Sequence, residues 1–261
     1  MSYVDELFSL HGKTAIVTGA ARGNGEAIAE ALLRAGSMVY VCDVMEDELN
    51  QTIARFRDDG LLVEGYVCDL SDAGEVKNFI SFVTEQSGDA GIDILVNNAG
   101  VTCGHSLEGY PQEYWDKTYN VNLMAPFILS KEIGLLMKST GKGGSIINIT
   151  SLNAEQAFPD NIAYVTFKGA LRQMTKSLAL DLGKYGVRAN NVGPGYFKTG
   201  MTLKSWADES MNEERKNNTI LGRWGDPKDL AGVIVFLASD SSSYVTGQDI
   251  YVDGGWLTKG M

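Results

Sequence analysis

The sequence predicts a single α/β domain, spanning residues 1–261, with a doubly wound and mostly parallel sheet of seven strands. Short runs rich in β-branched residues alternate with helical stretches along the whole chain, which is the pattern of βαβ units. No Pro/Ser-rich linker and no internal repeat divides the chain. Right-handed crossovers then favour a parallel sheet with helices on both faces.

The first half of the chain is expected to contain four strands and three helices. The strands are short β-branched runs, and the stretches between them have helical patterns. We expect strands at Thr14–Thr18, Met38–Cys42, Leu62–Cys68 and Ile92–Val96. We expect helices at Gly25–Ala35, Asp47–Asp58 and Ala73–Gln86.

The second half continues the alternation with longer helices. Strands are expected at Ser145–Ile149, Arg188–Val192 and Asp249–Val252. Helices are expected at Tyr114–Lys138, Ile162–Tyr185 and Lys228–Ala238. The polar stretch Thr199–Leu221 has no strong strand pattern, so we expect a segment at about 197–221 to cross the sheet edge as a lid over the substrate.

Charge and composition exclude several kinds of partner. The formal net charge is −11 at pH 7 without a basic block, which argues against nucleic acid and anionic membranes. The longest apolar runs, such as Ala231–Ala238, are too short to span a bilayer, and Met1–Phe8 lacks the apolar core of a secretory signal. Cys42, Cys68 and Cys103 fit neither a metal site nor a disulfide framework, so we expect a cytoplasmic protein without a metal.

A glycine-rich turn follows the first strand and opens the first helix. It spans residues 18–25, TGAARGNG, in the strand–turn–helix context that a dinucleotide site requires. Gly19 permits the tight turn, Gly23 lets the backbone approach a pyrophosphate, and Gly25 lets the helix pack closely against the strand. The N–H groups of the helix N-terminus, with Arg22 and Asn24, then face the phosphates of a Rossmann-type site.

Asp43 determines the expected choice of cofactor. It ends the second strand about 20 residues after the turn, where a carboxylate accepts hydrogen bonds from the adenosine ribose hydroxyls. The same charge repels the 2′-phosphate of NADP. Arg22 beside the turn could instead hold that phosphate. We expect NAD, with NADP as the alternative.

Further motifs occur in order along the chain. They are the Gly-xxx-Gly-x-Gly turn, Asn97-Asn98-Ala99-Gly100, Asn122, Ser151, Tyr164 with Lys168, Pro194-Gly195 with Thr199, and Asp253-Gly254-Gly255-Trp256. Together they resemble the short-chain dehydrogenase/reductase family in its single-domain form, over essentially the whole chain. The C-terminal half looks most like gluconate and other sugar or polyol dehydrogenases, and also resembles 3-oxoacyl-carrier-protein reductases.

The chain departs from the family pattern at four positions. Asn24 replaces an apolar residue, and Phe167 replaces the usual small residue before the lysine. Asn191 and Gly193 replace more common alanines. These departures affect packing and leave the catalytic groups in place.

Tyr164 and Lys168 are spaced to lie on one face of a helix. A free tyrosine has a pKa of about 10, and a nearby Lys168 ammonium is expected to lower it, so that Tyr164 acts as a general acid–base. Ser151 is expected to hydrogen-bond the substrate oxygen and to hold it toward the nicotinamide. The resemblance implies that Lys168 also binds the nicotinamide ribose and that Asn122 positions a proton-relaying water.

The resemblance also implies the remaining cofactor contacts. Asp69 and Leu70 would flank the adenine, and Asn98 and Gly100 would line the ribose side. The nicotinamide end would meet Pro194, Gly195, Phe197 and Thr199.

The substrate is expected beyond the carboxyl ends of the strands, where ligands of open α/β sheets bind. The polar candidates there are Ser151, Asn153, Gln156 and His105. Several hydrogen-bonding side chains suit a polyol or a sugar acid, whereas a fatty acyl chain would prefer an apolar channel. We therefore expect an NAD-dependent dehydrogenase of a small hydroxylated substrate such as gluconate.

Two alternative functions stay open. An NADPH-dependent 3-oxoacyl-carrier-protein reductase would require Arg22 to outweigh Asp43. A non-catalytic dinucleotide-binding protein would be expected to lack Tyr164, Lys168 or Ser151, and all three are present. The resemblance further implies a homotetramer that buries the long helices near Tyr114–Lys138 and Ile162–Tyr185 and the C-terminal strand.

Overall fold

Seven strands form one sheet in the order β3-β2-β1-β4-β5-β6-β7 in the computed structural model, which describes residues 2–259. All six pairings are parallel, which confirms the predicted sheet. The order reverses between β1 and β4, and this reversal opens a crevice at the carboxyl edge. The strands are β1 Thr14–Thr18, β2 Met38–Asp43, β3 Val63–Val67, β4 Ile94–Asn97, β5 Gly144–Ile149, β6 Val187–Pro194 and β7 Asp249–Val252.

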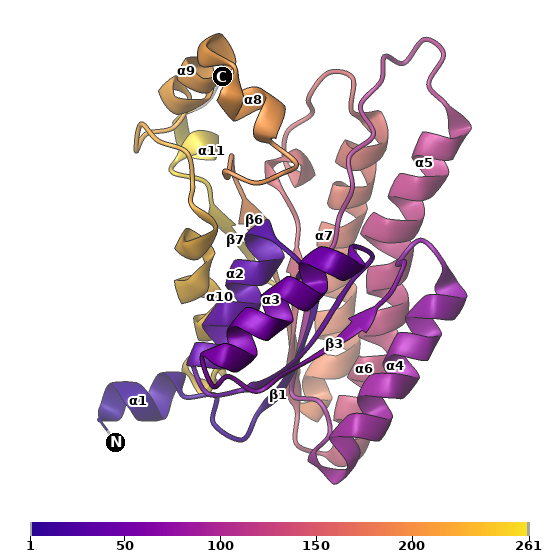
Figure 1. Ribbon diagram of the computed structural model, residues 1–261, viewed down its shortest axis with the longest axis vertical. Coiled ribbons are helices and arrows are strands. Elements are labelled where there is room, and N and C mark those ends of the chain that lie inside the picture. The colour runs from indigo at the N-terminus through magenta and orange to yellow at the C-terminus, as the bar shows by residue number, and fades with distance from the viewer. Residues whose placement is uncertain (1, 260–261) are drawn as a thin grey trace.

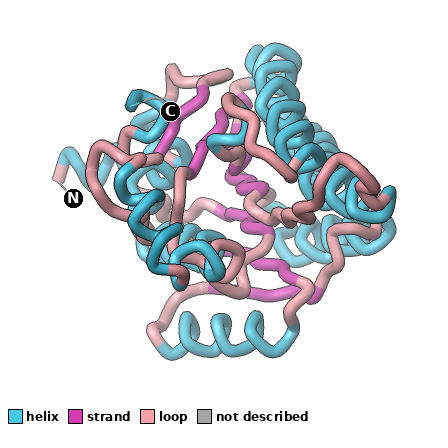
Figure 2. The backbone as a smooth tube through the Cα atoms, turned by 90° about the horizontal axis from the view of Figure 1, so that it is seen from above, coloured by secondary structure: helices cyan, strands magenta, loops and turns pink. Residues whose placement is uncertain are grey.

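Helices cover both faces of the sheet, as Figures 1 and 2 show. One face carries α2 Gly23–Arg34, α3 Glu46–Asp58 and α10 Ala231–Ala238. The opposite face carries α4 Ala73–Ser87, α6 Ala125–Thr140 and α7 Ile162–Leu182, with α5 Gln112–Tyr119 above them. No helix within residues 2–259 is long and apolar enough to cross a membrane.

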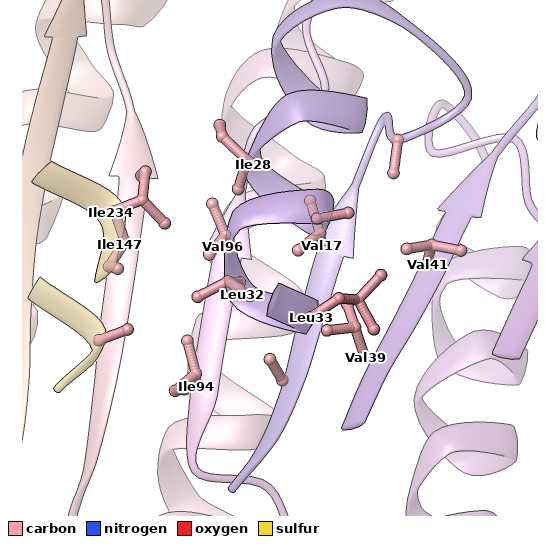
Figure 3. Packing of buried hydrophobic residues seen from close by; sticks show 14 of the residues in the cluster. Val17, Ile28, Leu32, Leu33, Val39, Val41, Ile94, Val96, Ile147 and Ile234 are labelled. Carbon is pink, nitrogen blue, oxygen red and sulfur yellow. The ribbon is translucent and has the colours of Figure 1, made fainter. Parts of the chain in front are cut away.

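Apolar side chains from α2, α10 and the strands pack together in one buried cluster (Figure 3). The central strands β1 and β4 are buried at every position and present apolar residues to both faces, which explains their nearly continuous apolar runs. Fully burying one such side chain contributes about 1.5–3 kcal/mol. The labelled members are Val17, Ile28, Leu32, Leu33, Val39, Val41, Ile94, Val96, Ile147 and Ile234.

The helix predicted over Tyr114–Lys138 is interrupted. A π-helical turn, Asn120–Met124, separates α5 from α6. Pro126 lies in the first turn of α6 and has no N–H to donate to the carbonyl of Asn122, four residues earlier. The prediction of one continuous helix was therefore wrong, because it did not take into account the hydrogen bond that Pro126 cannot form.

The polar segment after β6 contains two short helices, α8 Leu203–Ala207 and α9 Glu209–Asn217. Figure 1 shows them above the carboxyl ends of β6 and β7, beside α11 Trp256–Lys259. At the opposite edge, α1 Tyr3–Phe8 begins the chain and is capped by Ser2. The segment thus lies over the edge of the sheet that the polar sequence was expected to cross.

Candidate active site

The glycine-rich turn joins β1 to α2 at the centre of the sheet. Gly19 and Gly23 have φ values of +66° and +62°, a left-handed region that favours glycine. A Cβ atom on Gly25 would lie 2.0 Å from the Gly19 carbonyl oxygen, so helix and strand approach at backbone distance. Arg22, the N-cap of α2, makes no side-chain cap hydrogen bond to its first turn.

Asp43 and Arg22 lie on different sides of this turn. Asp43 ends β2, and its Oδ2 and Oδ1 accept hydrogen bonds from Ala21 N at 3.0 Å and Met45 N at 3.1 Å. The Arg22 guanidinium lies against Gly200, where an added Cβ would be 3.3 Å from Arg22 Cζ. The carboxylate therefore borders the turn, whereas the guanidinium reaches toward the segment after β6.

Asn98 connects the end of β4 to the glycine-rich turn. Its Nδ2 donates to the carbonyl oxygens of Thr18 at 2.9 Å and Gly19 at 3.0 Å. Its backbone N–H donates to Thr18 Oγ1 at 3.1 Å. Both amide hydrogens of the side chain are therefore used inside the protein, and Asn98 holds the turn in shape.

Lys168 is buried at the carboxyl ends of β4 and β5. Its Nζ donates to the Ile149 carbonyl at 2.7 Å and lies 5.6 Å from the ring centroid of Tyr164. Burial lowers the pKa of Lys168 to about 8. A Cβ on Gly100 would lie 3.5 Å from both Lys168 Nζ and Asn122 Oδ1, so these polar groups converge there.

Tyr164 and Ser151 complete this polar group. Burial raises the pKa of Tyr164, and a hydrogen bond with Ser151 opposes the rise. The expected lowering by Lys168 is not seen: the pKa of Tyr164 lies above its usual value, because burial outweighs the hydrogen bond with Ser151. The Ser151 Oγ donates to Asn153 Oδ1 at 3.1 Å and accepts from Asn153 N at 3.2 Å, so Asn153 orients the hydroxyl.

Asn122 is fully buried in the π-helical turn. Its Oδ1 accepts from Val101 N at 2.8 Å and its Nδ2 donates to the Val101 carbonyl at 2.9 Å. The side chain thus fixes the loop after β4. Its backbone carbonyl, which Pro126 cannot hydrogen-bond, is the group suited to hold a water.

The remaining cofactor candidates lie at the same edge. Pro194 ends β6, and a Cβ on Gly195 would lie 2.7 Å from Asp253 Cα. The ring of Phe197 is buried beside Gly225, so only its backbone can face a ligand. A Cβ on Gly23 would lie 3.4 Å from Thr199 Cγ2, which places Thr199 across from the turn.

Asp69 and Leu70 follow β3 on the other side of the crevice. Asp69 N donates to Glu75 Oε2 at 2.6 Å, and Asp69 Oδ1 accepts from Ser71 N at 2.8 Å. Leu70 is buried against the core. The loop after β3 is therefore rigidly held at the carboxyl edge.

Comparison with known proteins assigns the family. A family model described as Enoyl-(Acyl carrier protein) reductase matches residues 19–257, nearly the entire chain. The chain belongs to the short-chain dehydrogenase/reductase family. As a member it is an oxidoreductase that uses a nicotinamide dinucleotide on CH–OH groups.

Curated relatives and a solved structure cover almost the whole protein. It is 38% identical to gluconate 5-dehydrogenase of Gluconobacter oxydans, covering 98% of each chain. It is 38% identical to 2-dehydro-3-deoxy-D-gluconate 5-dehydrogenase of Bacillus subtilis, covering 99% of this chain and 100% of the relative. A solved structure of a gluconate 5-dehydrogenase from Burkholderia cenocepacia, in complex with NADP and tartrate, has a TM-score of 0.92 to this chain. The two sequences are 34% identical, and the match covers 98% of this chain and 99% of the other.

The crevice of this dehydrogenase fits a dinucleotide. Gly19 and Gly23 have positive φ values and carry no side chain, so a phosphate can approach the backbone at these positions. Asn24 Oδ1 is buried without a hydrogen-bond partner among residues 2–259. A buried polar atom of this kind indicates a place where a ligand or water supplies the missing hydrogen bond. No group of three or more His, Cys, Asp or Glu that could hold a metal occurs in the same range.

The substrate candidates are only partly brought together. Asn153 contacts Ser151, and Gln156 follows in the same loop with its Oε1 buried and unpartnered within residues 2–259. His105 is exposed, and its ring contacts its own loop through Ser106 O at 2.9 Å and the ring of Tyr110 at 6.2 Å. Its backbone N–H donates to the Asp160 carbonyl, in the loop after β5, at 2.8 Å. The structure gives His105 no contact with Ser151.

Arg172 is a positioning candidate that the sequence analysis missed. It lies four residues after Lys168 on α7, and its Nη2 is 2.9 Å from Glu155 Oε1. The Tyr251 hydroxyl donates to the same Glu155 oxygen at 2.9 Å. These contacts anchor the loop after Ser151 to α7 and β7. The four-residue spacing from Tyr164 through Lys168 to Arg172 was the available signal.

Proposed function

We propose that this dehydrogenase uses NAD to oxidise one hydroxyl group of a small polyol or sugar acid of the gluconate type, and reduces the ketone in reverse. The observation that carries the proposal is the convergence of Ser151, Tyr164 and Lys168 at the carboxyl edge of the sheet, the edge that also carries the glycine-rich turn. The gluconate dehydrogenases among its relatives support this substrate class.

In the proposed reaction the protein moves a proton at the substrate oxygen. The Ser151 hydroxyl donates a hydrogen bond to that oxygen, and the Tyr164 phenolate accepts the proton of the substrate hydroxyl. When bound, the oxidised dinucleotide would take the hydride from the carbon, and its positive ring would favour the phenolate. Lys168 adds positive charge beside Tyr164, and a water on the Asn122 carbonyl would carry the proton onward.

The same proposal assigns the cofactor contacts along the crevice. Backbone groups of the turn hold the pyrophosphate, Asp43 binds the adenosine ribose, and Lys168 binds the nicotinamide ribose. The residues that would hold the dinucleotide are Gly19, Arg22, Gly23, Asn24, Gly25, Asp43, Asp69, Leu70, Asn98, Gly100, Tyr164, Lys168, Pro194, Gly195, Phe197 and Thr199.

NAD is proposed over NADP because Asp43 borders the turn while Arg22 lies against Gly200. The Burkholderia relative was solved with NADP, so the choice requires a direct test. We expect Asp43→Ala to shift the ratio of kcat/KM values for NAD and NADP toward NADP by at least about tenfold, since a like-charge repulsion is removed. Steady-state kinetics with both dinucleotides measure this, and an unchanged ratio contradicts the ribose assignment.

The first experiment on the substrate follows nicotinamide absorbance with purified protein. NAD or NADP is paired with sugar acids and polyols, and NADH or NADPH with an acetoacetyl thioester. NAD-linked oxidation of a sugar acid or polyol supports the proposal. Reduction of the thioester by NADPH alone would replace it with the 3-oxoacyl reductase function and show that Arg22 outweighs Asp43.

Three further features belong to the same proposal. The segment 197–221, which carries α8 and α9, closes as a lid over the substrate. The protein forms a homotetramer through the exposed sides of α6 and α7. It acts in the cytoplasm, where the buried free thiols of Cys42 and Cys68 stay reduced.

A further inference from the structure

A cluster of aromatic rings lies at the carboxyl ends of β5, β6 and β7. Phe158 follows Ser151 in the loop after β5, Tyr196 follows Pro194, and Trp256 follows β7. The ring centroid of Phe158 lies 5.5 Å from that of Trp256 and 6.4 Å from that of Tyr196, and the last two are 6.1 Å apart. Three neighbouring strand ends therefore share one aromatic wall next to the catalytic loop.

Arg215 adds a positive charge to this wall from α9. Its guanidinium carbon lies 4.7 Å from the ring centroid of Tyr196, and only 20% of its side chain is exposed. Nη1 is 3.0 Å from Glu214 Oε1, whose side chain is 59% exposed. Nε is buried and has no hydrogen-bond partner within residues 2–259. The Nε–H donor of the guanidinium is thus buried and unpaired among the described residues.

Two further buried polar atoms have no hydrogen-bond partner in the described chain, one two residues before Phe158 and one on Trp256 itself. They are Gln156 Oε1 and Trp256 Nε1. An unsatisfied buried polar atom is costly, and native proteins usually leave one only where a ligand or a water completes it. The amide oxygen of Gln156 can accept a hydrogen bond from a ligand hydroxyl group, and the indole N–H of Trp256 can donate one. The guanidinium of Arg215 suits a ligand carboxylate.

The other cations near α9 are less suited to bind a carboxylate. Arg223 Nη1 forms an ion pair with Asp229 Oδ2 at 2.6 Å, and Lys216 Nζ forms one with Glu213 Oε1 at 2.5 Å. Lys198 and Lys204 are exposed, so their strongly hydrated ammonium groups attract an anion weakly. Arg22 lies against Gly200 beside the phosphate-binding turn.

We propose that Arg215 binds the carboxylate of the substrate through its Nε edge, while Gln156 and Trp256 bind hydroxyl groups along the aromatic wall. The inference rests on the proposed function and makes the enzyme selective for sugar acids over uncharged polyols. A planar guanidinium binds a carboxylate with two parallel hydrogen bonds, which also orients the carbon chain in the site. Because Arg215 is on α9, the acid itself would hold the proposed lid closed.

The test compares gluconate with glucitol, which lacks the carboxylate, at saturating NAD. We expect Arg215→Gln to lower kcat/KM for gluconate by about 10- to 100-fold, mainly through KM, which is the loss of a charge-assisted pair. We expect Arg215→Lys to recover part of this loss, and kcat/KM for glucitol to change less than about twofold in both variants. Lys204→Gln, which removes an exposed cation on α8, is the matched control and should change neither substrate.

An equal loss for both substrates would show that Arg215 only supports the segment and would overturn the carboxylate assignment. No loss for either substrate would overturn it as well. Calorimetric titration of gluconate into the NAD-loaded Tyr164→Phe variant, with and without Arg215→Gln, tests binding apart from turnover. If wild type oxidises neither compound, the proposed function fails, and the titration still decides the role of Arg215. Gluconate that binds equally with and without the arginine, or does not bind, overturns the proposal.

Discussion

At the scale of single residues, the proposed chemistry depends on ionisable groups that the fold keeps away from water. Burial raises the pKa of Tyr164 and lowers that of Lys168, so both effects favour the neutral forms. With a pKa of about 8, Lys168 keeps most of its charge at about pH 7, while Tyr164 stays neutral, so the pair alone supplies little phenolate. The positive charge of an oxidised nicotinamide would favour the phenolate, so cofactor binding and activation of Tyr164 are coupled in this proposal.

Tyr164→Phe removes the proposed proton acceptor without changing the shape of the ring. We expect kcat to fall by about 10²- to 10⁴-fold or more, because general acid–base catalysis is lost. The dissociation constant for NAD, measured by fluorescence titration, should stay nearly unchanged. Tyr244→Phe, at a fully exposed tyrosine, is the control and should keep full activity. Ordinary turnover in Tyr164→Phe would contradict the mechanism.

Lys168→Met tests the energetic cost of the buried ammonium. The pKa of Lys168 is lowered from 10.5 to about 8, so below pH 8 the folded protein bears the full cost of a buried charge. Between these values the unfolded chain binds more protons than the folded protein, and stability rises with pH. Without dinucleotide we expect Lys168→Met to raise the free energy of unfolding at about pH 7 by ~1–3 kcal/mol.

Urea unfolding of wild type and Lys168→Met at neutral pH and near pH 10 measures this effect. The difference between the two proteins should shrink at the higher pH, because the wild-type lysine is then neutral in the folded state. A variant that is less stable at neutral pH would show that the hydrogen bond to Ile149 outweighs the desolvation.

At the scale of elements, the start of α2 is determined by backbone contact. A Cβ on Gly25 would lie 2.0 Å from Gly19 O and 2.4 Å from Asn98 Nδ2, so any side chain displaces the helix or the strand end. The turn, the helix and Asn98 therefore form one rigid unit, and the N-terminus of α2 points to a fixed place in the crevice.

Gly25→Ala is expected to destabilise the protein by about 1–3 kcal/mol through overpacking, and to weaken NAD binding. Gly232→Ala in α10 is the matched control, because its Cβ would meet no atom within 4 Å. That change should stabilise the helix by about 0.5–1 kcal/mol. Urea unfolding and fluorescence titration measure both effects, and normal stability of Gly25→Ala would contradict the close approach of backbone.

The interruption between α5 and α6 shows how one residue changes an element. Apolar periodicity continues from Tyr114 to Lys138, so the periodicity alone predicts one helix. Pro126 removes one hydrogen bond of the ladder, and the chain adjusts through the π-helical turn that contains Asn122. The carbonyl proposed to hold a water is thereby released by a proline four residues later.

At the scale of the whole molecule, a chain of buried polar groups crosses four strands. Asn97 Nδ2 donates to Asn148 Oδ1 at 2.7 Å, and Asn148 Nδ2 donates to Thr175 Oγ1 at 2.8 Å. Thr175 Oγ1 donates to Asn191 Oδ1 at 2.6 Å, and Asn191 Nδ2 donates to Asp249 Oδ1 at 2.8 Å. The chain explains why Asn191, a departure from the family pattern, is tolerated inside the sheet.

The proposed tetramer would bury apolar side chains that are exposed on α6 and α7. Phe127 and Leu135 on α6 are 46% and 45% exposed, and Leu180 on α7 is 83% exposed. Such side chains on adjacent helices suit an interface between copies. We expect Leu180→Glu to shift the assembly toward smaller species in sedimentation velocity. Leu62→Glu, which alters a 65% exposed leucine outside these helices, should leave the assembly unchanged. A wild-type monomer would contradict the tetramer.

The fold was largely predictable because its signals are local. Burial of the central strands on both faces produces apolar runs, and the glycine-rich turn ends one such run. All seven strands and all six predicted helical segments occur, with boundaries that differ by a few residues and one interruption. The helices α8 and α9 were missed because their polar sequences carry no strong apolar period.

The sequence by itself determined the sheet, the glycine-rich turn and the candidate residues Ser151, Tyr164 and Lys168, because spacing along the chain encodes these features. Only the tertiary structure decided which candidates meet. It paired Asn153 with Ser151, joined the His105 backbone to Asp160 without bringing its ring to Ser151, and brought Arg215 to Tyr196. The physical reason is that contacts between strand ends join residues far apart in the chain, and their burial and charge depend on packing that no local pattern records.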